Sequence, residues 1–205
     1  MSRSRLPLLA AVVTTACCLA GIALCFWWFD WRVSAPTPVP PGHVALQTGA
    51  RVVLPPALAA LAVDDAPVLV HFYNPDCPCS RFNKEQLLEL HAKWGTKVRF
   101  IVVAETTKPH VDSPLGNDAP LLLDPESELA DALAVYSTPQ AVLLGADRSL
   151  VYAGNYNTSR YCTDPHTEFV RLALERLAED GPPLAQLPAW GCQLPAHVAR
   201  AEVTP

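Results

Sequence analysis

Residues 66–80 read APVLVHFYNPDCPCS and contain the boundary between a predicted strand and a predicted helix. The first half of this stretch, residues 66–73, is a short apolar run of β-forming residues and predicts a buried strand. Residues 79–94 follow with apolar side chains at helical spacing, which predicts a helix that ends before Gly95. Two cysteines, Cys77 and Cys79, therefore stand where a strand ends and a helix begins.

Further elements are expected on both sides of this stretch. A strand at 98–104 would complete a parallel strand–helix–strand unit, and a hairpin and a closing helix would follow it. This order predicts an α/β fold, a mixed β-sheet flanked by helices on both faces. The other expected strands are 44–54, 121–123, 140–144 and 149–152, and the other expected helices are 57–61 and two that start at Asp124-Pro125 and Asp164-Pro165.

The N-terminal segment predicts one transmembrane helix ahead of the domain. Residues 6–29 carry no charge, and as a helix they would span about 36 Å, enough for a bilayer core. Arg3 and Arg5 precede the run and tryptophans crowd its far end, which places residue 1 in the cytoplasm. A cleaved signal peptide or a lipoprotein signal is the competing interpretation, but the run is long and no clean cleavage site follows it.

These features divide the chain into three parts. Residues 1–32 form a cytoplasmic tip and a membrane anchor, residues 33–41 a stiff proline-rich linker, and residues 42–205 the exported domain with a proline-rich tail. The expected location is a bacterial inner membrane, single-pass, with the C-terminal domain in the periplasm. With a net charge of −5 and 17% charged residues among 205, the chain is neither disordered nor a nucleic-acid binder.

Cys77 is the candidate nucleophile. We expect it at the N-cap of the helix with Pro78 at the first helical position, so that its sulfur faces the free amides of Cys79 and Ser80. Those amides and the helix dipole favour a thiolate. A Cys77–Cys79 disulfide would close a small, easily reduced ring, which is typical of a redox switch.

Phe72-Tyr73 before the motif, Cys77 at the helix start and Thr138-Pro139 before the hairpin are the residues that carry a family resemblance. The chain resembles the thioredoxin-like superfamily, in particular its membrane-anchored bacterial members. The resemblance implies a cis Pro139 and a Thr138 backbone that, together, shape a substrate groove. It also places Ser80 where the family has its resolving cysteine, and Cys79 where the family usually has proline.

The remaining cysteines leave alternatives open. Cys79 is the first candidate to resolve a mixed disulfide on Cys77, and Cys162 or Cys192 is the second. Cys162 and Cys192 are also expected as a structural disulfide that ties the tail to the domain. No cofactor is expected, because the sulfur pair holds the electrons.

The sequence thus predicts a membrane-anchored thiol–disulfide oxidoreductase with Cys77 and Cys79 as catalytic residues. Its partners would be thiols or disulfides of exported proteins, an unidentified redox partner and the membrane, with no nucleic acid. One alternative is a Cu(I)-binding protein that uses the thiols and His71, although a histidine in an apolar strand is more often a core residue. Another is a non-catalytic docking module, since position 80 lacks a cysteine.

Overall fold

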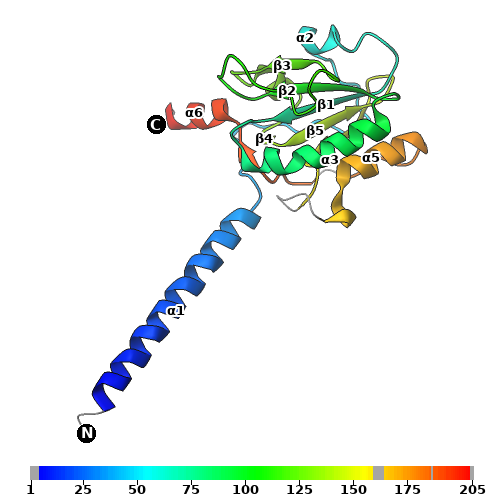
Figure 1. Cartoon of the computed structure of the whole chain (residues 1–205). Helices are drawn as coiled ribbons and strands as arrows, with labels where there is room; N and C mark the ends of the chain where they lie inside the picture. The colour runs from blue at the N-terminus through cyan, green and yellow to red at the C-terminus, as the bar shows by residue number, and fades with distance from the viewer. Residues whose placement is uncertain (1–4, 159–163, 186, 204–205) are drawn as a thin grey trace. The chain divides into compact units, whose positions relative to one another are not determined.

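The computed structural model describes residues 5–158, 164–185 and 187–203 (Figure 1). It divides into two compact units, Met1–Ala35 and Pro36–Pro205. The first unit is helix α1, Arg5–Ser34. Its stretch Pro7–Asp30, 24 residues, is long and apolar enough to cross a membrane, by length and composition. In the described part of the chain this is the single helix of that kind.

The second unit is built on a five-stranded sheet in the order β3-β2-β1-β5-β6. The central strand β1 pairs in parallel with β2 and antiparallel with β5, so that Leu69 lies between Phe100 and Leu143. All six residues of β1 are buried because it has a neighbour on each side and helices on both faces. The strands are β1 (Val68–Tyr73), β2 (Arg99–Ala104), β3 (Leu121–Leu123), β5 (Gln140–Leu144) and β6 (Leu150–Gly154).

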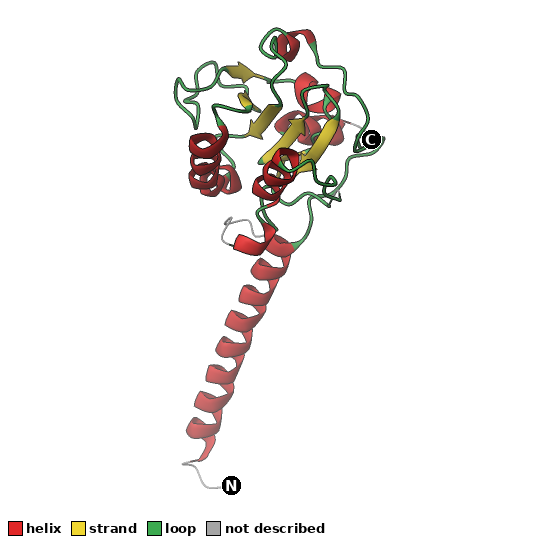
Figure 2. Ribbon diagram, turned by 90° about the vertical axis from the view of Figure 1, so that its right-hand side faces the viewer, coloured by secondary structure: helices red, strands yellow, loops and turns green. Residues whose placement is uncertain are grey.

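Two apolar clusters fill the space between the sheet and its helices, and Figure 2 shows helices on both sides of the strands. Helices α3 (Pro78–Trp94) and α5 (Phe169–Ala178) cover one face, where Leu87 and Leu174 pack with Leu69. Helices α2 (Pro56–Ala59) and α4 (Glu128–Ala132) contribute to the cluster on the other face. Successive strand residues alternate between the two clusters, as the pleat of a strand requires.

The helix starts follow their sequence signals. Pro78 occupies the first turn of α3 and Cys77 is its N-cap, as predicted. The Asp124 carboxylate accepts hydrogen bonds from the amides of Glu128, Leu129 and Ala130 at 2.8–2.9 Å, so it caps α4 from outside the helix. A short 3-10 helix, η1 (Pro165–Thr167), precedes α5, where the sequence predicted one continuous helix.

The expected opening strand at 44–54 does not form. Arg51 makes an isolated antiparallel bridge with Ser149, and the side chains of Val44 and Val53 are exposed. Without burial of their apolar side chains, these residues gain nothing from extending the sheet. The sequence did not predict the elements in the tail, strand β7 (Cys192–Gln193) and helix α6 (Pro195–Val203).

The proline that leads the hairpin has the geometry that the resemblance implied. The Thr138–Pro139 peptide bond is cis, and it joins the short strand β4 (Ser137–Thr138) to β5. The parallel strand–helix–strand unit, the hairpin behind this proline and the closing helix α5 together form a thioredoxin-like fold. The predicted fold class is therefore confirmed.

Candidate functional site

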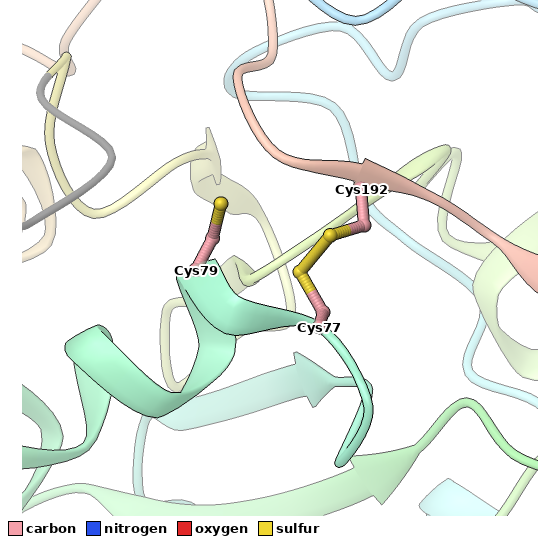
Figure 3. Close-up of side chains that lie close together, drawn as sticks. All are labelled: Cys77, Cys79 and Cys192. Carbon is pink, nitrogen blue, oxygen red and sulfur yellow. A yellow bond between two sulfur atoms is a disulfide. The ribbon is translucent and has the colours of Figure 1, made fainter. Parts of the chain in front are cut away.

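Three cysteine sulfurs gather at the start of α3, as Figure 3 shows. Cys77 and Cys192 form a disulfide with an S–S distance of 2.12 Å, although 115 positions separate them in the sequence. Cys79 is a free thiol, and the three Sγ atoms all lie within 4.8 Å of one another. Both Cys77 and Cys79 are only 2% exposed, and Cys192 is the more accessible member of the group.

The pairing differs from the two that the sequence favoured. Cys77 and Cys79 stand two positions apart at the start of a helix, and such side chains do not face each other. Cys192 reaches Cys77 because β7 pairs with β4, which places Cys192 opposite Thr138. The expected Cys162–Cys192 bridge is therefore corrected to Cys77–Cys192, and Cys162 lies outside the described residues.

The Cys77 sulfur has a different neighbour from the one expected. It makes no capping hydrogen bond to the amides of α3. It lies 3.5 Å from the carbonyl oxygen of Thr138, because the bond to Cys192 turns it toward β4. Its position at the N-cap still puts it at the positive end of the α3 dipole, which stabilises a thiolate once the disulfide opens.

The loop before the motif is fixed by its own polar groups. The backbone N–H of Cys77 donates to the carbonyl of Asn74 at 3.0 Å, and the Asn74 N–H donates to Ser80 Oγ at 3.2 Å. Ser80 thus holds the loop against the helix. The resemblance placed this serine at the position of a resolving cysteine. The carboxylate of Asp76 pairs with Lys108 at 2.6 Å, which offsets its negative charge next to Cys77.

The carbonyl oxygen of Thr138 lies against the disulfide, and the cis Pro139 directly follows Thr138. Thr138 is fully buried, and its backbone pairs with that of Cys192. The backbone of Thr138, at which the resemblance implied a substrate groove, is thus paired with the chain's own tail. Gly191, which precedes Cys192 in the tail, approaches β4 so closely that a Cβ on Gly191 would collide with the Thr138 carbonyl oxygen.

A buried carboxyl group lies at the same edge of the sheet. Glu105 follows β2 directly and is fully buried, its N–H donates to the carbonyl of Tyr73, and Ser127 Oγ donates to its carboxyl at 2.7 Å. Burial, with repulsion from Asp124, raises the pKa of Glu105 to about 9. Because parallel strands end at one edge, this protonated acid and the Cys77 loop lie at the carboxyl ends of neighbouring strands.

His71 is a core residue rather than a ligand. Its ring lies in the middle of β1, Nδ1 is 2.7 Å from the hydroxyl of Tyr156, and it is not part of the cysteine cluster. Burial lowers the pKa of His71 to about 3, so that the imidazole is neutral. A Cu(I) site at Cys77 and Cys79 would therefore need a third ligand other than His71. The sulfur of Cys192 lies close enough to both cysteines to be that ligand.

Sequence reasoning missed the residues that hold the tail in the groove. They are Thr37, Tyr136 and Asn155, which hydrogen-bond to main-chain atoms of residues 189–191, and Ser137, whose backbone pairs with that of Gln193. Polar residues in loops carry little sequence signal for such contacts. A glycine directly before a cysteine was the one available sign, since glycine permits a close backbone approach.

Two solved structures share this fold. The structure of a hypothetical protein from Sinorhizobium meliloti has a TM-score of 0.58 at 22% identity, over 74% of this chain and 95% of that one. An uncharacterized conserved protein from Geobacillus kaustophilus has a TM-score of 0.57 at 24% identity, over 78% and 96%. A putative thioredoxin from Neisseria meningitidis, with a TM-score of 0.45 at 13% identity over 58% and 79%, is too distant to support a conclusion.

No curated protein matches the chain. One family model does, over residues 47–193, and its description is a domain of unknown function, DUF6436. The match runs from the segment before α2 to the end of β7, so it includes the motif, the cis-proline hairpin and all three clustered cysteines. The chain belongs to the DUF6436 family.

Proposed function

We propose that the protein is a thiol–disulfide oxidoreductase in which Cys77 and Cys192 are the redox pair. The observation that carries the proposal is their disulfide at the N-cap of α3, beside the cis Pro139 and with a third thiol within 4.8 Å. Sulfur at a helix N-terminus is a good leaving group and a good nucleophile, because its thiolate is stabilised there.

The cycle needs two external partners. A dithiol reduces the bridge and becomes a disulfide, which leaves Cys77 and Cys192 with two electrons and two protons. The Cys77 thiolate then attacks a substrate disulfide, and one substrate sulfur leaves as a thiol. Cys192 attacks the mixed disulfide at Cys77, restores the Cys77–Cys192 bond and frees the second substrate thiol. The same steps in reverse oxidise a dithiol, and the reduction potentials of the partners set the direction.

Cys192 takes the resolving role in this proposal because it already bonds to Cys77. Cys79 was the first candidate from the sequence, and its thiol is near enough to compete. The two assignments differ in which substitution stops turnover, so they can be separated by experiment.

The test is the reduction of a peptide disulfide by dithiothreitol, catalysed by the full chain in detergent. We expect Cys77→Ser and Cys192→Ser to lower the rate at least about tenfold, and Cys25→Ser in α1 to leave it unchanged. A rate that falls with Cys79→Ser and not with Cys192→Ser would move the resolving role to Cys79. No catalysis by the unsubstituted chain would contradict the proposal and leave a docking role.

We also propose that α1 anchors the protein in a bacterial inner membrane with the domain in the periplasm. Its length and composition, with Arg3 and Arg5 before it, support this orientation. Alkaline phosphatase fused to the C-terminus should be active, because that enzyme folds only in an oxidising compartment. An inactive fusion that is present at full length would reverse the orientation.

Soft-metal binding is a second candidate function, favoured by the three clustered thiols. In the reduced state Cys77, Cys79 and Cys192 would offer three sulfur ligands, and thiolates select Cu(I). The test is an anaerobic titration of the reduced chain with Cu(I) against a chelator. One equivalent should be retained, and each of the three Cys→Ser substitutions should release it, whereas His71→Gln should not. Complete loss of Cu(I) to the chelator from the unsubstituted chain would exclude this function.

A further inference from the structure

The tail segment before Cys192 is held beside Cys77 through its main chain. The N–H of Ala189 donates to the hydroxyl of Tyr136 at 3.0 Å, and the carbonyl of Ala189 accepts from the N–H of Thr37 at 2.7 Å. Neither contact uses the alanine side chain. A different polypeptide in the same extended conformation could therefore make both hydrogen bonds.

The next residue is held in the same way. The side-chain amide of Asn155 accepts from the N–H of Trp190 at 3.0 Å and donates to its carbonyl. Beyond it, Cys192 and Gln193 pair antiparallel with Thr138 and Ser137. Thr37 Oγ1 also donates to the carbonyl of Gly191 at 3.1 Å, so the protein holds residues 189–193 by their backbone, which is how an extended peptide is bound when it adds a strand.

Gly191 is the position where the groove is selective. A Cβ on this residue would collide with the Thr138 carbonyl oxygen and lie 2.9 Å from Ser137 Oγ. The carbonyl oxygen and carbon of Thr138 are backbone atoms of β4, so a larger residue cannot be accommodated by turning a flexible side chain. An extended peptide that presents its cysteine to Cys77 along this path therefore needs glycine immediately before the cysteine.

Two flanking side chains of the tail are deeply buried. Ala189, three residues before Cys192, and Leu194, two residues after it, are both fully buried. Leu194 packs in the cluster that also contains Leu133 and Val135. The groove therefore takes a small residue on one side of the cysteine and an aliphatic residue on the other.

We propose that residues 189–194 occupy the substrate groove while the Cys77–Cys192 bond is closed, and that the substrate is an extended polypeptide in which glycine precedes the reacting cysteine. This inference rests on the proposed redox function and specifies its substrate class. While the Cys77–Cys192 bond is closed, the tail occupies β4 and Cys77 is only 2% exposed, so a substrate segment enters only as the tail leaves.

Because the tail and the substrate use the same backbone sites, closing the Cys77–Cys192 bond also displaces the product. When a dithiol reduces the bridge, the tail leaves β4 and the substrate segment takes its place. Cys77 then forms a mixed disulfide with the substrate cysteine as described above. When Cys192 attacks that bond, the Cys77–Cys192 disulfide forms, the substrate leaves as a thiol, and the returning tail occupies the backbone sites that the substrate used.

The test uses the full chain in detergent, reduced, with every cysteine except Cys77 replaced by serine. The probe is the nonapeptide LPAWGCQLP, which copies residues 187–195, with 5-thio-2-nitrobenzoate on its cysteine. A second probe carries alanine in place of the glycine. Release of the coloured thiolate reports attack by Cys77, and reaction with free glutathione corrects for the reactivity of each probe.

We expect the glycine probe to react at least about tenfold faster than the alanine probe. We also expect Gly191→Ala in the protein to raise the rate with the glycine probe about tenfold, because the tail can no longer occupy the groove. Gly181→Ala is the matched control, since a Cβ there meets only ordinary contacts at 3.5 Å and should leave the rate unchanged.

Equal rates for the two probes would overturn the substrate inference while the redox function stands, because Cys77 would still exchange disulfides. If Cys77 reacts with neither probe, the redox function and the inference both fail. The comparison of the two probes needs no substitution of Gly191, so it decides the question even if Gly191→Ala impairs folding.

Discussion

Removal of the Cys77–Cys192 bridge should destabilise the domain strongly. The bridge joins residues 115 positions apart, and closing a loop of that length in the unfolded chain is worth about 4.8 kcal/mol at 25 °C on the chain-entropy model. Cys192→Ser abolishes the bridge and replaces one sulfur by an oxygen. We therefore expect the oxidised chain to lose about 4–5 kcal/mol of its free energy of unfolding.

The assay is a urea series on the full chain in mild detergent, read by proteolysis of the unfolded domain. With a slope of about 2 kcal/mol per M, the midpoint should fall by about 2 M in Cys192→Ser. Reduced unsubstituted protein should match that variant, and Cys79→Ser should match the oxidised unsubstituted chain, because Cys79 forms no bridge. A difference below about 1 kcal/mol between the oxidised chain and Cys192→Ser would mean that the bridge does not stabilise the domain.

Two further substitutions test the buried polar groups. Glu105→Gln should flatten the pH dependence of stability. Burial raises the pKa of Glu105 from its ordinary value of 4.5 to about 9, so the folded carboxyl keeps its proton while the unfolded one loses it. The unsubstituted domain should then lose up to about 1.4 kcal/mol of its free energy of unfolding per pH unit as pH rises between these values. Urea midpoints measured across that range give this slope for both proteins, and the same slope in Glu105→Gln as in the unsubstituted domain would contradict the prediction. Asp124→Ala removes the acceptor of three α4 amides and should cost about 1–3 kcal/mol, with Asp124→Asn in between; equal urea midpoints for all three proteins would disprove the capping role.

Local patterns were sufficient for most of the fold. The apolar run at 68–73, the helix that follows it and the strand at 99–104 lie within two residues of their predicted bounds. Each of these elements is signalled by its own residues, because a buried strand and an amphipathic helix have distinct periods. The expected strand at 44–54 does not form: Val52 is buried, but Val44 and Val53 are exposed, and periodicity cannot report which residues of a segment are covered.

The site was predictable only in part. The position of Cys77 at a strand–helix junction follows from the sequence, but its partner does not, because cysteine connectivity depends on which distant segments meet. Cys192 meets Cys77 through the β4–β7 pairing, a two-residue contact too short to leave a periodic pattern. The raised pKa of Glu105 was equally invisible, since it depends on burial beneath neighbouring elements.

Disulfide mapping by mass spectrometry shows whether Cys77 and Cys192 form a reversible redox bridge. The full chain, made in an oxidising compartment, is equilibrated in a series of glutathione buffers, quenched with acid, alkylated and digested. We expect a Cys77–Cys192 peptide pair with Cys79 alkylated, and a reversible two-electron opening of that pair while the domain stays folded. A Cys77–Cys79 or Cys162–Cys192 pair in the oxidised protein, or a Cys77–Cys192 bond that opens only when the domain unfolds, would contradict this expectation.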